Sequence, residues 1–150
     1  MRLLFVCAGN ICRSPMAEAL FRRRAAAVPA LAEVQAASAG VIALTGNQAS
    51  PAAVSTLRDE YGIDIAGHRA SSFDPTADDL VVALDAWVGA RARDLAPGAR
   101  IVLVGDFAGA EGEEVEDPYG GSIDDYRRAA AHIDRLVAAI VDRLVREGSS

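Results

Sequence analysis

Hydrophobic residues along the chain gather in four short segments that are separated by longer amphipathic ones. The segments lie at residues 3–6, 34–37, 80–84 and 101–104, and glycine, proline or polar residues border each of them. Short apolar runs of this kind are typical of strands that are buried on both faces of a sheet. We therefore predict four buried β-strands.

Helix signals lie between these predicted strands. Ser14-Pro15 is typical of an N-cap followed by proline at the first helical position, and predicts a helix that runs to about residue 27. Ser50-Pro51 repeats the signal and predicts a helix that ends before Gly62. Residues 85–95 are predicted as a short helix and residues 105–121 as a loop. Apolar residues at helical spacing predict a long final helix that faces the sheet: Ile133, Leu136, Val137, Ile140, Val141 and Leu144.

Buried strands that alternate with helices predict an α/β fold. The economical arrangement is a single doubly wound domain, residues 1–150, with a four-stranded parallel sheet flanked by helices. Such sheets bind ligands beyond the carboxyl ends of their strands, where the chain switches direction. The loop that follows the first predicted strand begins at Cys7 and lies at this edge.

Charge and composition narrow the classes of partner. The chain of 150 residues carries 15 basic and 21 acidic side chains, a formal net charge of −6, which argues against nucleic acid or an anionic membrane as partner. No apolar stretch approaches the roughly 20 residues of a membrane span, and no signal peptide is evident, so a cytoplasmic location is expected. Two cysteines and two distant histidines predict neither a disulfide framework, nor a metal site, nor a cofactor.

The segment from Cys7 to Ser14 combines a strand end, a tight loop and a helix N-terminus, which together form an anion site. Gly9 allows close backbone approach, and Arg13 offers a planar fork of donors that matches phosphate oxygens. A thiol in this positive field ionises more readily than a free thiol, so Cys7 is expected to be a nucleophilic thiolate. Ser14 can donate its hydroxyl proton to that sulfur. The pattern predicts attack on a phosphate ester.

These residues resemble the signature loop of the low-molecular-weight protein tyrosine phosphatases, whose fold is the four-stranded parallel sheet predicted above. The resemblance extends along most of the chain through matching short motifs. They are Cys7 to Pro15 (CAGNICRSP), Ser38-Ala39-Gly40, Gly62-Ile63-Asp64, His68-Arg69-Ala70 and Asp117-Pro118-Tyr119.

The resemblance implies a role for each matching residue. Cys7 is the nucleophile that forms a phosphocysteine, Arg13 binds phosphate and stabilises the transition state, and Asp117 is the general acid and then the base. By itself, Asp117 would fit an ordinary turn aspartate. The residues implied to surround the substrate phosphate are Ala8, Gly9, Asn10, Ile11, Cys12, Arg13, Ser14 and Tyr119.

Further residues are implied to support the loop. Asn10 and Ser38 hold it in a strained shape, and His68 supports Asn10 and Ser14. Cys12 resembles a family cysteine that traps oxidised Cys7 as a disulfide, although a small buried filler is the alternative. Trp87 and Tyr126 are expected to be packing residues. The implied substrate is a phosphorylated protein or a small aryl phosphate, and the product is inorganic phosphate.

The walls of the expected site depart from the family pattern. Residues 41–46 contain no aromatic residue, and Tyr119 is followed by Gly120 rather than by a second aromatic. These features resemble a bacterial branch of the family that includes protein-arginine phosphatases, but its arginine-specific members carry threonine where this chain has Ile11. We expect phosphotyrosine as the substrate, with phosphoarginine as the alternative.

Two further functions stay open. An arsenate reductase on the same fold needs additional cysteines to relay a disulfide, and this chain has only Cys7 and Cys12, so glutathione or mycothiol would have to substitute. The second open function is that of a module that binds a phosphorylated ligand without turnover. The presence of Cys7, Arg13 and Asp117 together argues against it.

Overall fold

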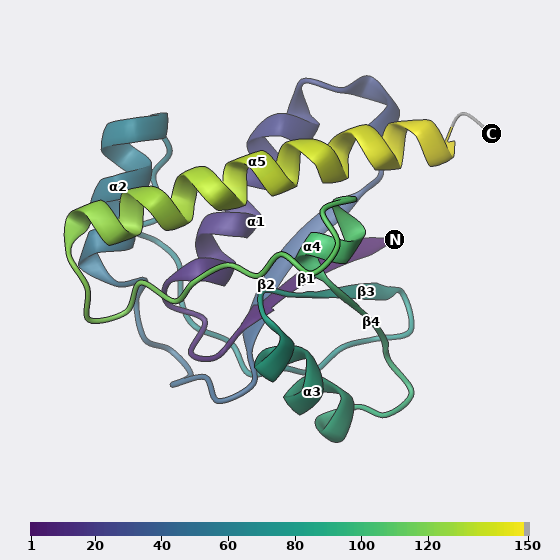
Figure 1. Ribbon diagram of the computed structural model, residues 1–150, viewed down its shortest axis with the longest axis horizontal. Coiled ribbons are helices and arrows are strands. Elements are labelled where there is room, and N and C mark those ends of the chain that lie inside the picture. Colours follow the sequence, from purple (N-terminus) through teal and green to yellow (C-terminus); the bar gives the residue numbers. More distant parts are fainter. Residues whose placement is uncertain (149–150) are drawn as a thin grey trace.

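The computed structural model describes residues 1–148 (Figure 1). Helices and strands alternate along the chain. In order they are β1 (Arg2–Cys7), α1 (Arg13–Ala26), the 3-10 turn η1 (Pro29–Leu31), β2 (Gln35–Gly40), α2 (Pro51–Tyr61), β3 (Asp79–Ala83), α3 (Ala86–Leu95), β4 (Arg100–Leu103), α4 (Val104–Phe107) and α5 (Ile123–Gly148).

The four strands form one parallel sheet in the order β2-β1-β3-β4. Phe5 in the middle of β1 pairs with Ser38 of β2 on one side and with Val82 of β3 on the other. The chain therefore runs from β1 to β2 at one edge of the sheet, and then crosses to the other side of β1 to form β3 and β4. This arrangement confirms the predicted fold class and places the switch point at the carboxyl end of β1.

Alternate residues of β1 pack into two separate cores. Leu3 and Phe5 are fully buried on the face covered by α1, α2 and α5, whereas Leu4 and Val6 face α3 and contact the cluster that contains Val88. Figure 1 shows α5 stacked over α1 on one side of the sheet and α3 on the opposite side. Burial on both faces explains why the strands read as apolar runs.

Helix α5 buries the apolar stripe that its spacing predicts. The stripe shares a core with Leu3 and Phe5, but α5 contacts α1 and α2 far more extensively than the sheet. The stripe therefore faces the core over this side of the sheet, as predicted, and α1 and α2 share that core. Across residues 1–148, no helix is long and apolar enough to cross a membrane.

The predicted start of α1 is wrong by two positions, since Ser14 was expected as the N-cap and Pro15 as the first helical residue. The helix begins at Arg13 with Cys12 as its N-cap, and no side chain caps it. Ser14 does not cap because its hydroxyl instead contacts Cys7 and Asn10. By contrast, Ser50 caps α2 by accepting a hydrogen bond from the backbone of Ala53, as predicted.

Smaller corrections concern other boundaries. The second strand runs to Gly40 rather than stopping at residue 37, because every residue of it pairs with β1. The short helix α4 (Val104–Phe107) replaces the last residue of the predicted fourth strand and the first three residues of the predicted loop. Trp87 was expected to pack, but 57% of it is exposed at the start of α3.

Candidate active site

The loop after β1 folds back over the carboxyl end of the sheet. The carbonyl groups of Cys7 and Ala8 accept hydrogen bonds from the backbone of residues 41 and 42, and Ile11 accepts one from Ser50. Gly40 lies directly beneath, where an added Cβ would stand 2.6 Å from the Ala8 carbonyl oxygen. The glycine of the Ser-Ala-Gly motif is therefore required for close packing of this loop.

Cys7 ends β1 and is buried, and its sulfur lies 2.9 Å from the Ser14 hydroxyl oxygen. That hydroxyl accepts a hydrogen bond of 2.8 Å from the side-chain amide of Asn10. Because the amide nitrogen only donates, the Ser14 hydroxyl proton can go to the Cys7 sulfur at 2.9 Å or to the Ala39 carbonyl at 3.4 Å, and the shorter contact is the one to sulfur. The geometry provides a donor to the sulfur, as predicted.

Asn10 holds the loop through its side-chain amide and its backbone carbonyl. It is fully buried and is the one non-glycine residue with positive φ, 59°, among the described residues. Its amide donates to Ser38 at 3.0 Å, and its side-chain oxygen accepts from the backbone of Ser71 at 2.8 Å. His68 Nε2 lies 2.7 Å from the Asn10 carbonyl oxygen and contacts no atom of Ser14 at hydrogen-bond distance. These bonds fix a backbone conformation that asparagine tolerates but does not favour.

Arg13 is almost fully buried and is held by groups far from it in the sequence. Its Nη1 donates to Asp85 at 2.7 Å and to the Val115 carbonyl at 2.8 Å, while Nη2 lies 3.8 Å from Asp117. Sequence reasoning missed Asp85. A signal was present, since Asp85 follows a buried strand at the same sheet edge as Cys7.

Asp117 lies at the mouth of the site. Its side chain is 49% exposed, and its Oδ1 accepts a hydrogen bond of 3.1 Å from the backbone of Tyr119. The other oxygen faces Arg13. A carboxyl group in this position can exchange protons with a substrate or with water while staying close to the arginine.

A pocket of about 320 Å³ opens above Cys7 and brings the predicted catalytic residues together. Asn10 and Ser14 lie behind the pocket and do not line it. Ile42 and Leu44, which are 55% and 64% exposed, do line it and were missed because no local motif marks them. The lining residues are Cys7, Ala8, Gly9, Ile11, Cys12, Arg13, Ile42, Leu44, Asp117 and Tyr119.

Cys12 lies in a small buried cluster of hydroxyl groups. Its sulfur is 3.3 Å from the Tyr126 hydroxyl and 3.5 Å from the Ser50 hydroxyl, and these two hydroxyls lie 3.2 Å apart. Burial raises the pKa of the Cys12 thiol, although both hydroxyls act in the opposite direction. Burial also raises the pKa of Tyr126 to about 12. Tyr126 is therefore a polar partner of Cys12 as well as a packing residue.

No group of three or more histidine, cysteine, aspartate or glutamate side chains within residues 1–148 is placed to hold a metal ion. The pocket itself presents a thiol, a guanidinium and a carboxyl group beside the loop backbone.

Comparison with known proteins shows which family has this sequence and fold. The chain matches the low molecular weight phosphotyrosine protein phosphatase family over residues 2–150. It is 36% identical over 147 residues to EpsP, a probable low molecular weight protein-tyrosine-phosphatase of Ralstonia solanacearum, covering 95% of this chain and 94% of that one.

Solved structures agree with this match. The crystal structure of a low molecular weight protein tyrosine phosphatase from T. tengcongensis is 39% identical, with a TM-score of 0.84, and covers 95% of this chain and 99% of that one. The YwlE arginine phosphatase, in a cysteine-to-serine mutant whose active-site serine is phosphorylated, is 30% identical with a TM-score of 0.90 and 97% coverage of both chains.

The fold and the cysteine–arginine loop thus define a class of small phosphatases built on a parallel α/β sheet. Within it, the chain belongs to the low molecular weight phosphotyrosine protein phosphatase family.

Proposed function

We propose that the protein hydrolyses phosphotyrosine in proteins through a phosphocysteine intermediate on Cys7. The observation that supports this most is the convergence of Cys7, Arg13 and Asp117 on one pocket. A nucleophile, an anion-binding group and an acid–base group at one site are the parts that this reaction needs.

In the first step, the loop backbone and Arg13 bind the phosphate. The Cys7 sulfur attacks phosphorus, so an S–P bond forms while the bond from phosphorus to the tyrosyl oxygen breaks. Asp117 donates its proton to that departing oxygen. The negative charge of the phosphate favours the protonated carboxyl that this step requires.

In the second step, Asp117 is ionised and takes a proton from water as the water attacks phosphorus. The S–P bond breaks and inorganic phosphate is released. Ser14, 2.9 Å from the Cys7 sulfur, donates a hydrogen bond to the departing thiolate and stabilises its charge.

The lining of the pocket supports an aromatic substrate. Ile11, Ile42, Leu44 and Tyr119 surround the reactive sulfur with apolar surface, which an aryl ring would bury on binding. Aliphatic side chains here take the place of the aromatic wall that is absent from residues 41–46.

Hydrolysis of aryl phosphates tests the proposal. Cys7→Ser is expected to abolish turnover, and Asp117→Ala to slow it by about 10²- to 10⁴-fold, most strongly for poor leaving groups. Normal turnover by Cys7→Ser would refute the mechanism. Thiol consumption that depends on arsenate would instead support a reductase.

Phosphoarginine is the second candidate substrate, and the similarity to the YwlE arginine phosphatase favours it. Side-by-side hydrolysis of phosphotyrosine and phosphoarginine peptides distinguishes the two. Ile11→Thr adds a hydroxyl at the pocket wall and is expected to shift the preference toward phosphoarginine. An unchanged preference would mean that Ile11 does not select the substrate.

We also propose that the enzyme acts on phosphorylated proteins in the cytoplasm and that Cys12 protects Cys7 there. Peroxide oxidises the Cys7 thiolate to a sulfenic acid, and the Cys12 sulfur then attacks that sulfur, forming a disulfide and releasing water. Both cysteines line the same pocket and neither is paired in a disulfide in the described structure, which supports this proposal.

A further inference from the structure

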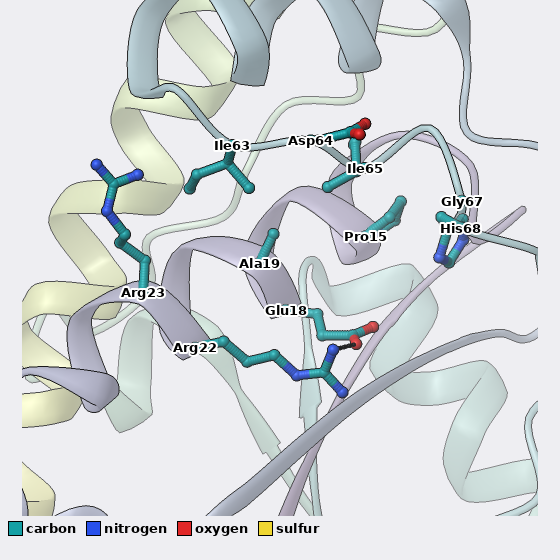
Figure 2. Close-up of a pocket in the computed structure, with 10 residues that line it drawn as sticks. All are labelled: Pro15, Glu18, Ala19, Arg22, Arg23, Ile63, Asp64, Ile65, Gly67 and His68. Carbon is teal, nitrogen blue, oxygen red and sulfur yellow. Dashed lines mark ion pairs between the residues drawn. The ribbon is translucent and has the colours of Figure 1, made fainter.

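A broad depression of about 550 Å³ lies beside α1, outside the catalytic pocket (Figure 2). Figure 2 shows Glu18 and Arg22 projecting from α1 toward each other as an ion pair, with His68 across the depression. His68 also contacts the backbone of Asn10, so the depression borders the back of the catalytic loop. Glu18 has no role in the mechanism given above.

A continuous chain of hydrogen bonds leads from Glu18 to the nucleophile. The Ser38 hydroxyl donates to Glu18 at 2.7 Å and lies 3.0 Å from the Asn10 amide nitrogen. The same nitrogen lies 2.8 Å from the Ser14 hydroxyl, which in turn is 2.9 Å from the Cys7 sulfur.

The carboxylate sets the direction of this chain. A carboxylate only accepts, so Ser38 directs its single proton to Glu18 and can only accept from Asn10. The Ser71 backbone, which donates to the Asn10 oxygen, keeps the amide nitrogen turned toward both hydroxyls. Ser14 therefore accepts from Asn10, and its proton is available to Cys7 at 2.9 Å, with the Ala39 carbonyl at 3.4 Å as the more distant acceptor.

We infer that Glu18 is a positioning residue for the nucleophile, acting through Ser38 and Asn10 to keep the Ser14 hydroxyl directed at Cys7. The inference rests on the proposed function. A hydrogen bond to an ionised acceptor is about twice as strong as one between neutral groups, so the charge of Glu18 fixes the chain more firmly than an amide would.

The surroundings of Glu18 keep its carboxylate in place. The side chain is only 16% exposed, and Arg22 lies 2.8 Å from its second oxygen while donating to the Ala36 carbonyl at 2.7 Å. The other charged or titratable groups that line the depression are Arg23, Asp64 and His68.

Glu18→Gln tests the inference because glutamine keeps the size of the side chain but removes its charge. We expect kcat for an aryl phosphate to fall about tenfold with KM changed less than twofold, the effect of losing one charge-assisted hydrogen bond. The pH midpoint of Cys7 alkylation by iodoacetamide, followed by peptide mass spectrometry, is expected to move upward by about one unit. Arg23→Gln, in the same depression, is the matched control and is expected to change neither.

A double-mutant cycle with Ser38→Ala tests whether Glu18 acts through Ser38. Glu18→Gln is expected to have no further effect once Ser38 is alanine. Persistence of the full tenfold loss in that background, or unchanged kcat and alkylation in Glu18→Gln alone, would overturn the inference.

One outcome separates this inference from the proposed function. If the wild-type protein hydrolyses no phosphate ester, the proposed function fails, yet Cys7 alkylation still reports on Glu18.

If Glu18→Gln does not fold, Arg22→Gln provides a milder change at a side chain that is 62% exposed. It is expected to lower kcat about twofold at unchanged KM, and no change would count against the inference.

Discussion

Arg13 lies between the two carboxylates of the site, those of Asp85 and Asp117. Asp85 and the Val115 carbonyl both bind Nη1, so the guanidinium is held in one orientation before any phosphate arrives. Neither bond uses Nη2, which lies toward Asp117 and the pocket. An arginine that is oriented in advance loses little side-chain entropy when it binds phosphate.

Asp85→Asn tests this orientation. Asparagine can still cap α3 as Asp85 does through Val88, so the change mainly removes the charge that faces Arg13. We expect kcat/KM for an aryl phosphate to fall about 10- to 100-fold, the range for loss of a hydrogen bond between charged groups. Asp94→Asn, an exposed change on the same helix, is the control. Equal kinetics in both variants would show that Arg13 needs no such partner.

The second prediction at this scale concerns Cys12. The hydrogen bond from Tyr126 lowers the pKa of Cys12, which burial keeps above its usual value. Tyr126→Phe removes that bond, so the pKa rises further, less thiolate is present at neutral pH, and the Cys7–Cys12 disulfide is expected to form several-fold more slowly after peroxide treatment. Thiol titration measures the rate. Tyr61→Phe is the control, and faster disulfide formation in Tyr126→Phe would contradict the assignment.

At the scale of elements, an ion pair between the half-buried Arg2 and the buried Asp79 joins β1 to β3. Arg2 binds both oxygens of Asp79 at 2.7 and 2.8 Å, and Asp79 is 2% exposed. The hydrogen bonds from Arg2 hold the pKa of Asp79 below its usual value despite its burial. A lowered carboxyl pKa contributes stability above the pKa of the unfolded chain, and this contribution is lost as the pH falls through the folded pKa.

Asp79→Asn is therefore expected to lower the free energy of unfolding at pH 7 by about 1–3 kcal/mol. The difference from wild type should narrow as the pH falls below about 4, where an unfolded aspartate becomes protonated. Urea unfolding at several pH values measures both. Asp78→Asn, at a carboxylate whose side chain is 76% exposed, is the control. A difference that is constant from pH 7 to pH 3 would contradict this explanation.

The strands could be predicted because burial on both faces leaves continuous apolar runs, as in β1 and β3. The start of α1 could not, because the cap signal at Ser14 competes with partners brought by folding, Cys7 and Asn10. Ser50 carries the same signal and does cap its helix. The two serines differ only in what the fold places beside them.

The same distinction applies to the site. Residues of the Cys7–Ser14 loop are consecutive, so their chemistry could be predicted from the sequence, and a family motif marked Asp117. Asp85 and Leu44 come from separate connections that meet only after the sheet forms. The bond from Ser38 to Glu18 depends on how α1 lies against β2, and no sequence spacing encodes it.

At the scale of the whole molecule, the sheet order β2-β1-β3-β4 explains why one edge carries the site. The chain departs from β1 in one direction and returns to it from the other, so the loops after β1, β2 and β3 meet at the switch point. These loops supply Cys7, Leu44 and Asp85, and the segment after α4 supplies Asp117. The central claim is that the phosphoryl group is transferred to the Cys7 sulfur before it is released as inorganic phosphate.

Trapping the intermediate tests that claim most directly. Asp117→Ala is mixed with p-nitrophenyl phosphate, whose leaving group needs little acid assistance, then rapidly denatured and analysed by peptide mass spectrometry, with Cys7→Ala as the control. Because the base for the second step is missing, we expect one phosphoryl group on the peptide that contains Cys7 and none in the control. Release of phosphate with no adduct on Cys7, or an adduct that persists in Cys7→Ala, would contradict it.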